Sequence, residues 1–183
     1  MADLCDRLDE IQGMTRILAA DVERLRPTLG ELDIQAAISD SEEGNRRFYV
    51  RAVFALVEAV VEQHKRLLLD LAERGTITLD PVVQNRLLEK KRYLRFEEKL
   101  RLVYETAADV FGQPITIPIA GRGWEAFLKA LETRHLITHP KTFNECHVDE
   151  EDIGLVDSGH TWFRDLQNDF VRIARHHRGQ HPW

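Results

Sequence analysis

The sequence predicts an all-α protein, an up-and-down helical bundle of about four to five core helices with an N-terminal amphipathic helix in front of it. Apolar residues recur at helical spacing through several long segments, and proline or glycine stands where most of these segments end. The chain has 183 residues, of which 43% are apolar, and this is enough for one domain with its own core. We expect the N-terminal helix in residues 1–28, the bundle in residues 41–177 and a flexible tail in residues 178–183.

The first predicted helix ends at Pro27, because proline cannot continue a helix interior. Leu4, Ile11, Leu18 and Leu25 recur every seven residues along it. So short a heptad series fits a coiled coil and packing on the rest of the domain equally well.

The second predicted helix begins near Asp40 or Ser41 and runs to Arg74, where Gly75 stops it. It is apolar on nearly every side, which predicts a central position. His64 falls on its apolar face and is expected to be a hydrogen-bonded core histidine. A narrow polar stripe is expected to form ion pairs or to line a cleft, and it consists of Arg47, Arg51, Glu58, Glu62 and Lys65.

A third helix is predicted from the cap residue Asp80 to Phe111, with Pro81 in its first turn and Gly112 after its end. Residues 86–101 carry an excess of basic side chains, which fits either a solvated helix face or a phosphate-attracting stripe. These basic residues are Arg86, Lys90, Lys91, Arg92, Arg95, Lys99 and Arg101.

Two further helices are predicted after a loop that contains two prolines. The first begins at Gly123 or Trp124 and ends near Thr138, because His139 precedes a proline and is therefore pushed out of the helical region. The last runs from about Ser158 to Arg175 with an aromatic stripe that is typical of core packing.

Composition narrows the function classes. The net charge of −6 argues against a general nucleic-acid coat. Cys5 and Cys146 lack the spacing of metal ligands, so we expect free thiols and no structural zinc. No cofactor is expected either. The acidic N-terminus does not resemble a secretory signal, and no apolar run approaches the roughly 20 residues of a membrane span, so a cytoplasmic location without membrane contact is expected.

An arginine followed after four to six intervening residues by a histidine is the chain's main candidate motif. It occurs at Arg134–His139, at Arg172–His177 and at Arg175–His181. The two later occurrences lie in or beside the polar tail, which has too little chain after it to build a pocket. Arg134 instead lies in the last turns of a predicted helix and His139 at its break, so both are expected at the mouth of the bundle.

The segment Glu132-Thr-Arg-His-Leu-Ile-Thr-His-Pro140 resembles the signature of the HEPN superfamily (higher eukaryotes and prokaryotes nucleotide-binding). Residues 48–61 resemble the first core helix of that family, and residues 96–105 and 124–127 resemble the stretches that lead up to its motif. The resemblance covers about residues 43–175. The family often has asparagine where this chain has His135, and some members have a modifiable tyrosine where this chain has Lys141.

The resemblance implies a metal-independent endoribonuclease, a toxin or antiviral-defence effector that acts as a homodimer on an RNA substrate. Such cleavage needs an acid and a base, which histidine can be near neutral pH, and a cation for the phosphorane charge, which arginine supplies. We expect His139 to be the acid or base, Arg134 the phosphate clamp and His135 a supporting polar group. Lys141 and Arg51 are expected substrate contacts, and no metal site is expected.

The same residues also fit other interpretations. Arg134 and His139 also fit a plain helix end, with the arginine on the last carbonyls of its own helix. A HEPN-like dimeric scaffold or nucleotide- or partner-binding module without catalysis is one alternative function. An interaction protein that docks through residues 1–27 is another, and the resemblance leaves open an antitoxin or a defence-system protein as a partner.

Overall fold

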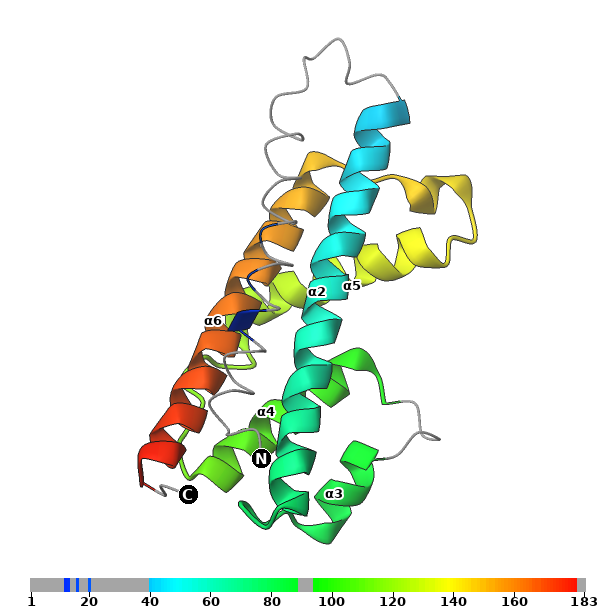
Figure 1. Ribbon diagram of the computed structural model, residues 1–183. Coiled ribbons are helices and arrows are strands. Elements are labelled where there is room, and N and C mark those ends of the chain that lie inside the picture. Colours follow the sequence, from blue (N-terminus) through cyan, green and yellow to red (C-terminus); the bar gives the residue numbers. More distant parts are fainter. Residues whose placement is uncertain (1–11, 14–15, 17–19, 21–39, 89–93, 181–183) are drawn as a thin grey trace. The chain divides into compact units, whose positions relative to one another are not determined.

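The computed structural model describes residues 12–13, 16, 20, 40–88 and 94–180, and within these ranges all regular secondary structure is helical. This confirms the predicted all-α class. The elements (Figure 1) are α2 (Asp40–Glu73), α3 (Pro81–Leu88), α4 (Phe96–Phe111), α5 (Gly121–Thr138), the short 3-10 helix η1 (Phe143–Cys146) and α6 (Glu150–Gln180). Residues 12, 13, 16 and 20 are helical, and the rest of the predicted first helix lies outside the described residues.

The chain divides into two compact units. Unit 1 contains Ala59–Ile119 and the chain from Arg164 onward, whereas unit 2 contains Gln12–Glu58 and Ala120–Phe163. The helices α2 and α6 each contribute one part to each unit. No helix within the described ranges is long and apolar enough to cross a membrane.

The helix α2 ends just before Gly75, as the sequence predicts. Gly75 has a φ of 71°, a left-handed conformation that glycine adopts without steric cost. The amide of Gly75 donates to the Ala72 carbonyl (3.0 Å), and the amide of Thr76 donates to the Leu71 carbonyl (2.9 Å). These paired hydrogen bonds satisfy carbonyls that the end of the helix would otherwise leave exposed.

The single helix predicted from Asp80 to Phe111 is wrong, because the structure has two helices there, α3 and α4. Asp80 caps the first as expected, since its Oδ1 accepts from the Val82 amide at 2.8 Å. The second has its own start at Arg95, whose amide donates to Glu98 Oε2 at 3.2 Å. Part of the basic segment lies in residues 89–93, outside the described ranges, so its role stays a prediction.

The start predicted for the last helix is also wrong, because α6 begins at Glu150 and not near Ser158. Asp149 and Asp152 form a reciprocal cap: Asp149 Oδ1 accepts from the Asp152 amide (2.9 Å), and Asp152 Oδ2 accepts from the Asp149 amide (3.2 Å). The helix continues to Gln180, so residues 178–180 of the expected tail are helical, and residues 181–183 lie outside the described ranges.

The core of unit 1 surrounds His64, which is fully buried as predicted. Its ring stacks on Phe170 with centroids 3.7 Å apart, and its Nδ1 lies 3.2 Å from the Tyr104 hydroxyl. Burial lowers the pKa of His64 to about 3, so the ring is neutral near pH 7. This histidine therefore belongs to the core and not to a reactive site.

The core of unit 2 is an aromatic cluster that holds α5 against the first part of α6. The rings of Trp124 and Phe127 lie 5.3 Å and 5.1 Å from that of Trp162. Two glycines permit this approach, because a Cβ at Gly123 would lie 2.6 Å from the Trp162 ring and one at Gly159 would lie 2.8 Å from the Phe127 Cα. The cluster anchors α5 and so fixes the direction in which its last turn points.

Candidate functional site

The predicted site residues all lie in unit 2, although they come from two segments far apart in the sequence. Arg51 lies on α2, and Arg134 and His135 lie in the last turns of α5. His139 and Lys141 follow the end of that helix. The fold therefore brings Arg47, Arg51 and Glu58 of the predicted α2 stripe into the same compact unit as the predicted motif, whereas Glu62 and Lys65 of that stripe belong to unit 1.

Arg134 forms an ion pair with Glu58 of α2. Its Nη2 lies 2.7 Å from Glu58 Oε1, and the two side chains are 28% and 39% exposed. The contact points the guanidinium at a neighbouring helix, whereas the plain helix-end interpretation placed it on the carbonyls of its own helix. An ion pair this exposed adds little stability, about 0.2–1 kcal/mol, so its main effect is to orient the guanidinium.

The end of α5 is set by His139, as the sequence predicts. His139 is the residue after the helix, and its φ of −131° and ψ of 54° are not helical because Pro140 follows. The His139 amide still donates to the His135 carbonyl at 3.0 Å, so the last turn remains closed. The Thr138 hydroxyl donates to the Arg134 carbonyl at 2.7 Å and satisfies a further acceptor there.

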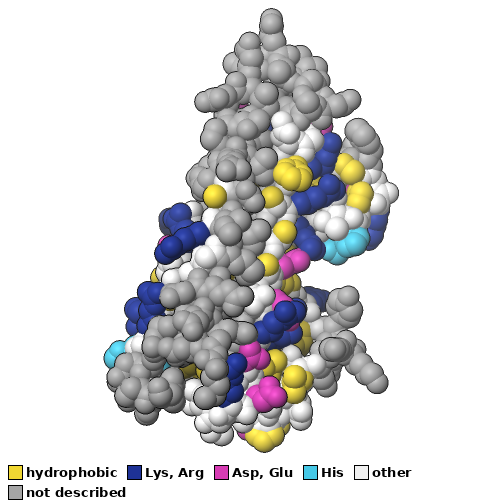
Figure 2. Space-filling view, viewed as in Figure 1, with side chains coloured by type: hydrophobic (Ala, Val, Ile, Leu, Met, Phe, Trp, Pro, Cys, Tyr) yellow, Lys and Arg dark blue, Asp and Glu magenta, His cyan; other side chains and the backbone are white. Residues whose placement is uncertain are grey.

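The two histidines of the motif lie side by side at the surface. Their ring centroids are 5.4 Å apart with an angle of 60° between the ring planes, and both side chains are exposed. On the face drawn in Figure 2, histidine atoms (cyan) reach the surface next to Lys or Arg atoms (dark blue). Both imidazoles are therefore open to a dissolved ligand.

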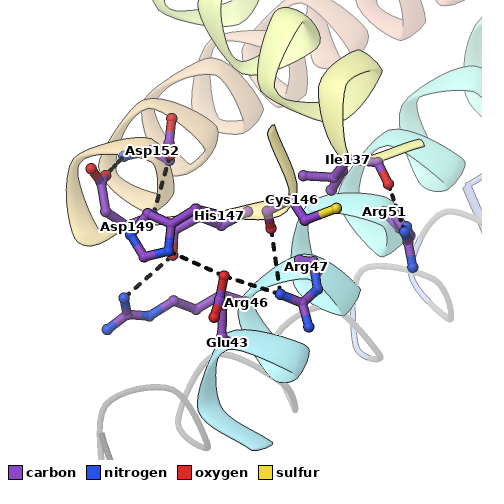
Figure 3. A network of polar contacts seen from close by, with 10 residues as sticks. Glu43, Arg46, Arg47, Arg51, Ile137, Cys146, His147, Asp149 and Asp152 are labelled. Atoms are coloured by element: carbon purple, nitrogen blue, oxygen red, sulfur yellow. Dashed lines mark hydrogen bonds and ion pairs between the residues drawn. The ribbon is translucent and has the colours of Figure 1, made fainter. Parts of the chain in front are cut away.

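Arg51 contacts α5, the helix that carries Arg134 and His135. Its Nη2 donates to the Ile137 carbonyl at 2.7 Å, and the Ile137 side chain is buried (Figure 3). This carbonyl belongs to the last turn of α5, where carbonyls lack partners within the helix. Arg51 thus caps the helix end, and the substrate contact expected of it stays a prediction.

The segment after His139 is held by its backbone at several points. The Lys141 amide donates to Glu145 Oε2 at 2.6 Å, while the Lys141 side chain is exposed. Arg46 and Arg47 of α2 donate to the carbonyls of Val148 and Cys146, each at 3.4 Å (Figure 3). Together with Arg51, these arginines anchor both ends of the turn that carries His139 and Lys141.

A small charged cluster supports this anchoring. Glu43 Oε1 lies 3.1 Å from Arg47 Nη1 and 3.1 Å from His147 Nδ1, so one carboxylate joins α2 to the chain after η1 (Figure 3). Sequence reasoning missed Glu43, Arg46 and Glu145 as parts of the site. The signal for Glu43 was its helical spacing from Arg47, because residues four apart lie on one helix face.

The arrangement is suited to a phosphate ester. An oriented guanidinium can hold phosphate oxygens, and an exposed imidazole can give or take a proton. No group of three or more His, Cys, Asp or Glu side chains in the described part of the chain is placed to hold a metal ion. The expected roles of Arg134, His135 and His139 are thus compatible with the geometry and stay predictions.

Comparison with known proteins identifies no relative. No family model matches the chain, and neither the curated proteins nor the solved structures include a match.

Proposed function

We propose that the chain is a metal-independent endoribonuclease of HEPN type, a toxin or antiviral-defence effector that acts as a homodimer with a composite active site. The observation that carries the proposal is the end of α5, where Glu58 orients Arg134 and His139 is exposed beside His135. These groups supply the positive charge and the proton transfer that are needed when a ribose 2′-hydroxyl attacks the adjacent phosphodiester and cleaves it.

Arg134 is the phosphate clamp in this mechanism. A guanidinium has five N–H donors, so the contact between Nη2 and Glu58 leaves donors for phosphate oxygens. Its charge stabilises the phosphorane as negative charge accumulates. Glu58 acts on the arginine and not on the substrate, and we therefore regard it as a positioning residue.

His139 transfers protons. As a base it removes the proton of the 2′-hydroxyl, whose oxygen attacks the adjacent phosphorus, and the bond to the leaving 5′-oxygen breaks. The leaving oxygen takes a proton from an acid, and the products carry 2′,3′-cyclic phosphate and 5′-hydroxyl ends. Because acid and base act in one reaction, a two-fold dimer that supplies a second copy of His139 completes the site.

The test is cleavage of total cellular RNA by the purified chain with EDTA present. Wild type is expected to cut, and His139→Ala is expected to lose at least about a hundredfold in rate because proton transfer is removed. His176→Ala replaces an exposed histidine of unit 1 and is expected to cut like wild type. Light scattering is expected to give twice the 21.2 kDa of one chain. Equal cutting by wild type and His139→Ala would refute the assignment.

A second candidate function is a HEPN-like dimeric scaffold without catalysis. The observation that favours it is again the Glu58 contact, because a carboxylate at 2.7 Å competes with a phosphate for the guanidinium of Arg134. The scaffold predicts a stable dimer whose RNA-cutting activity is absent in wild type and in Glu58→Gln alike. Cutting that depends on His139 excludes it.

A further inference from the structure

We propose that His135 and His139 form a two-histidine binding site for a divalent first-row transition metal ion, and that Cu²⁺ is the ion bound most tightly. The site needs only these two side chains and does not depend on RNA cleavage. Its consequence for catalysis rests on the proposed function: an ion bound to the imidazole of His139 would compete with proton transfer by that ring.

The spacing of the rings fits chelation of one ion. A metal–imidazole nitrogen bond is about 2.0–2.1 Å, so two imidazoles in neighbouring positions on one tetragonal or tetrahedral ion place their ring centroids about 4.5–5 Å apart. The observed separation is 5.4 Å, and the planes are tilted by 60° rather than stacked. A rotation of the exposed side chains about χ1 and χ2 is enough to close the remaining gap.

The backbone holds the pair at this separation. His135 and His139 are four residues apart, which places them on one face of the chain, and the 3.0 Å bond from the His139 amide to the His135 carbonyl keeps that turn closed. Two histidines at this spacing on one helix face also provide the metal ligands of some zinc enzymes. The backbone thus holds the two side chains within reach of one ion.

The local charge includes contributions of both signs. The carbonyl end of α5 is the negative pole of the helix and attracts a cation. Arg134 and Arg51 are cationic, but Glu58 pairs with the first and the Ile137 carbonyl accepts from the second. The ammonium of Lys141 is on an exposed side chain, where solvent screens its repulsion.

The chemistry selects the metal. Two neutral imidazoles favour borderline ions, and among divalent first-row ions the affinity rises to a maximum at Cu²⁺. No third His, Cys, Asp or Glu joins the pair within the described ranges, so water fills the remaining positions. The site is therefore expected to exchange its ion and to release it to EDTA.

The test is titration of the full, untagged chain with Cu²⁺ in the absence of RNA, followed by calorimetry and by electron paramagnetic resonance. Wild type is expected to bind one ion that shows hyperfine coupling to two nitrogens. His135→Ala and His139→Ala are each expected to raise the Kd for that ion at least tenfold, while the circular dichroism spectrum stays that of wild type.

His176, an exposed histidine near the C-terminus, provides the matched control. His176→Ala is expected to retain the two-nitrogen signal at wild-type affinity, because it removes an exposed histidine of unit 1. Unchanged Cu²⁺ affinity and spectrum in His139→Ala would overturn the proposal. An absence of RNA cleavage would leave this result intact, because binding is read without RNA.

Discussion

Arg134 Nη2 lies 2.7 Å from Glu58 Oε1, and this ion pair joins the last turns of α5 to α2 within unit 2. The partners are separated widely in sequence, and each lies on a helix whose direction is fixed by packing. Because both side chains are partly exposed, the pair contributes more to the direction of the guanidinium than to the free energy of unfolding.

Removing the carboxylate should impair RNA cleavage more than stability. We expect Glu58→Ala to lower the rate by about ten- to hundredfold, because a displaced clamp misaligns the phosphate. The free energy of unfolding should fall by no more than about 1 kcal/mol. Single-turnover cleavage and urea unfolding measure the two effects. Glu132→Ala, a change of an exposed carboxylate on α5, the helix that carries Arg134, is the control that should alter neither.

Arg51 is predicted to position the motif by capping the Ile137 carbonyl. Arg51→Ala should lower the free energy of unfolding by about 1 kcal/mol, because it removes a charged hydrogen-bond donor. It should also lower kcat, whereas Arg51→Lys should restore part of both. Arg122→Ala, which changes an exposed arginine of the same unit, should behave like wild type.

The salt dependence of RNA binding separates this role from a phosphate contact. A lost contact to single-stranded RNA would reduce the slope of log K against log salt by about 0.7, and a positioning residue leaves the slope unchanged. We expect an unchanged slope for Arg51→Ala. A reduced slope with normal kcat would instead assign Arg51 to the substrate.

Helix ends marked by glycine or proline were predictable from the sequence. Gly75 and Pro140 end their helices because of backbone constraints that act within a few residues, and the structure confirms both ends. The start of α4 was missed because no proline or glycine marks it, and the capping contact there is made by Arg95 and Glu98. Residues close to a helix end thus predict that end better than they predict a break within a long helical segment.

The candidate site was predictable only in part. The sequence indicated a polar stripe on α2 and a motif on α5, but periodicity assigns residues to faces and does not say which faces meet. The contacts of Arg134 with Glu58 and of Arg51 with the Ile137 carbonyl depend on tertiary packing. The aromatic contact of Phe127 with Trp162 holds α5 against α6 and so contributes to this packing.

Two glycines of α6 should respond in opposite ways to alanine. A Cβ at Gly159 would lie 2.8 Å from the Phe127 Cα, which is backbone and cannot move aside, whereas a Cβ at Gly154 would meet nothing within 4 Å. We expect Gly159→Ala to cost about 1–3 kcal/mol through overpacking. Gly154→Ala should add about 0.5–1 kcal/mol through helix propensity. Thermal unfolding measures both, and stabilisation by Gly159→Ala would contradict the packing described for unit 2.

His64 should make the stability of the protein depend on pH. Burial lowers its pKa in the folded chain to about 3 from an ordinary 6.5, so below pH 6.5 the unfolded chain binds a proton that the folded chain does not. The contribution of His64 is fully present above pH 6.5 and is lost as the pH falls toward 3. Between pH 7 and pH 5 this loss amounts to about 2 kcal/mol.

A non-titrating variant isolates that contribution. His64→Gln retains a polar group that can reach the Tyr104 hydroxyl, which lies 3.2 Å from Nδ1 in the wild type. It should be less stable than wild type at pH 7, since it loses the stacking on Phe170, but the deficit should shrink by about 2 kcal/mol at pH 5. Urea unfolding at both pH values measures this change, with His176→Gln, at an exposed position, as the control. A deficit that is the same at pH 7 and pH 5 would mean that His64 titrates normally in the folded chain and that its burial is less complete than the core of unit 1 implies.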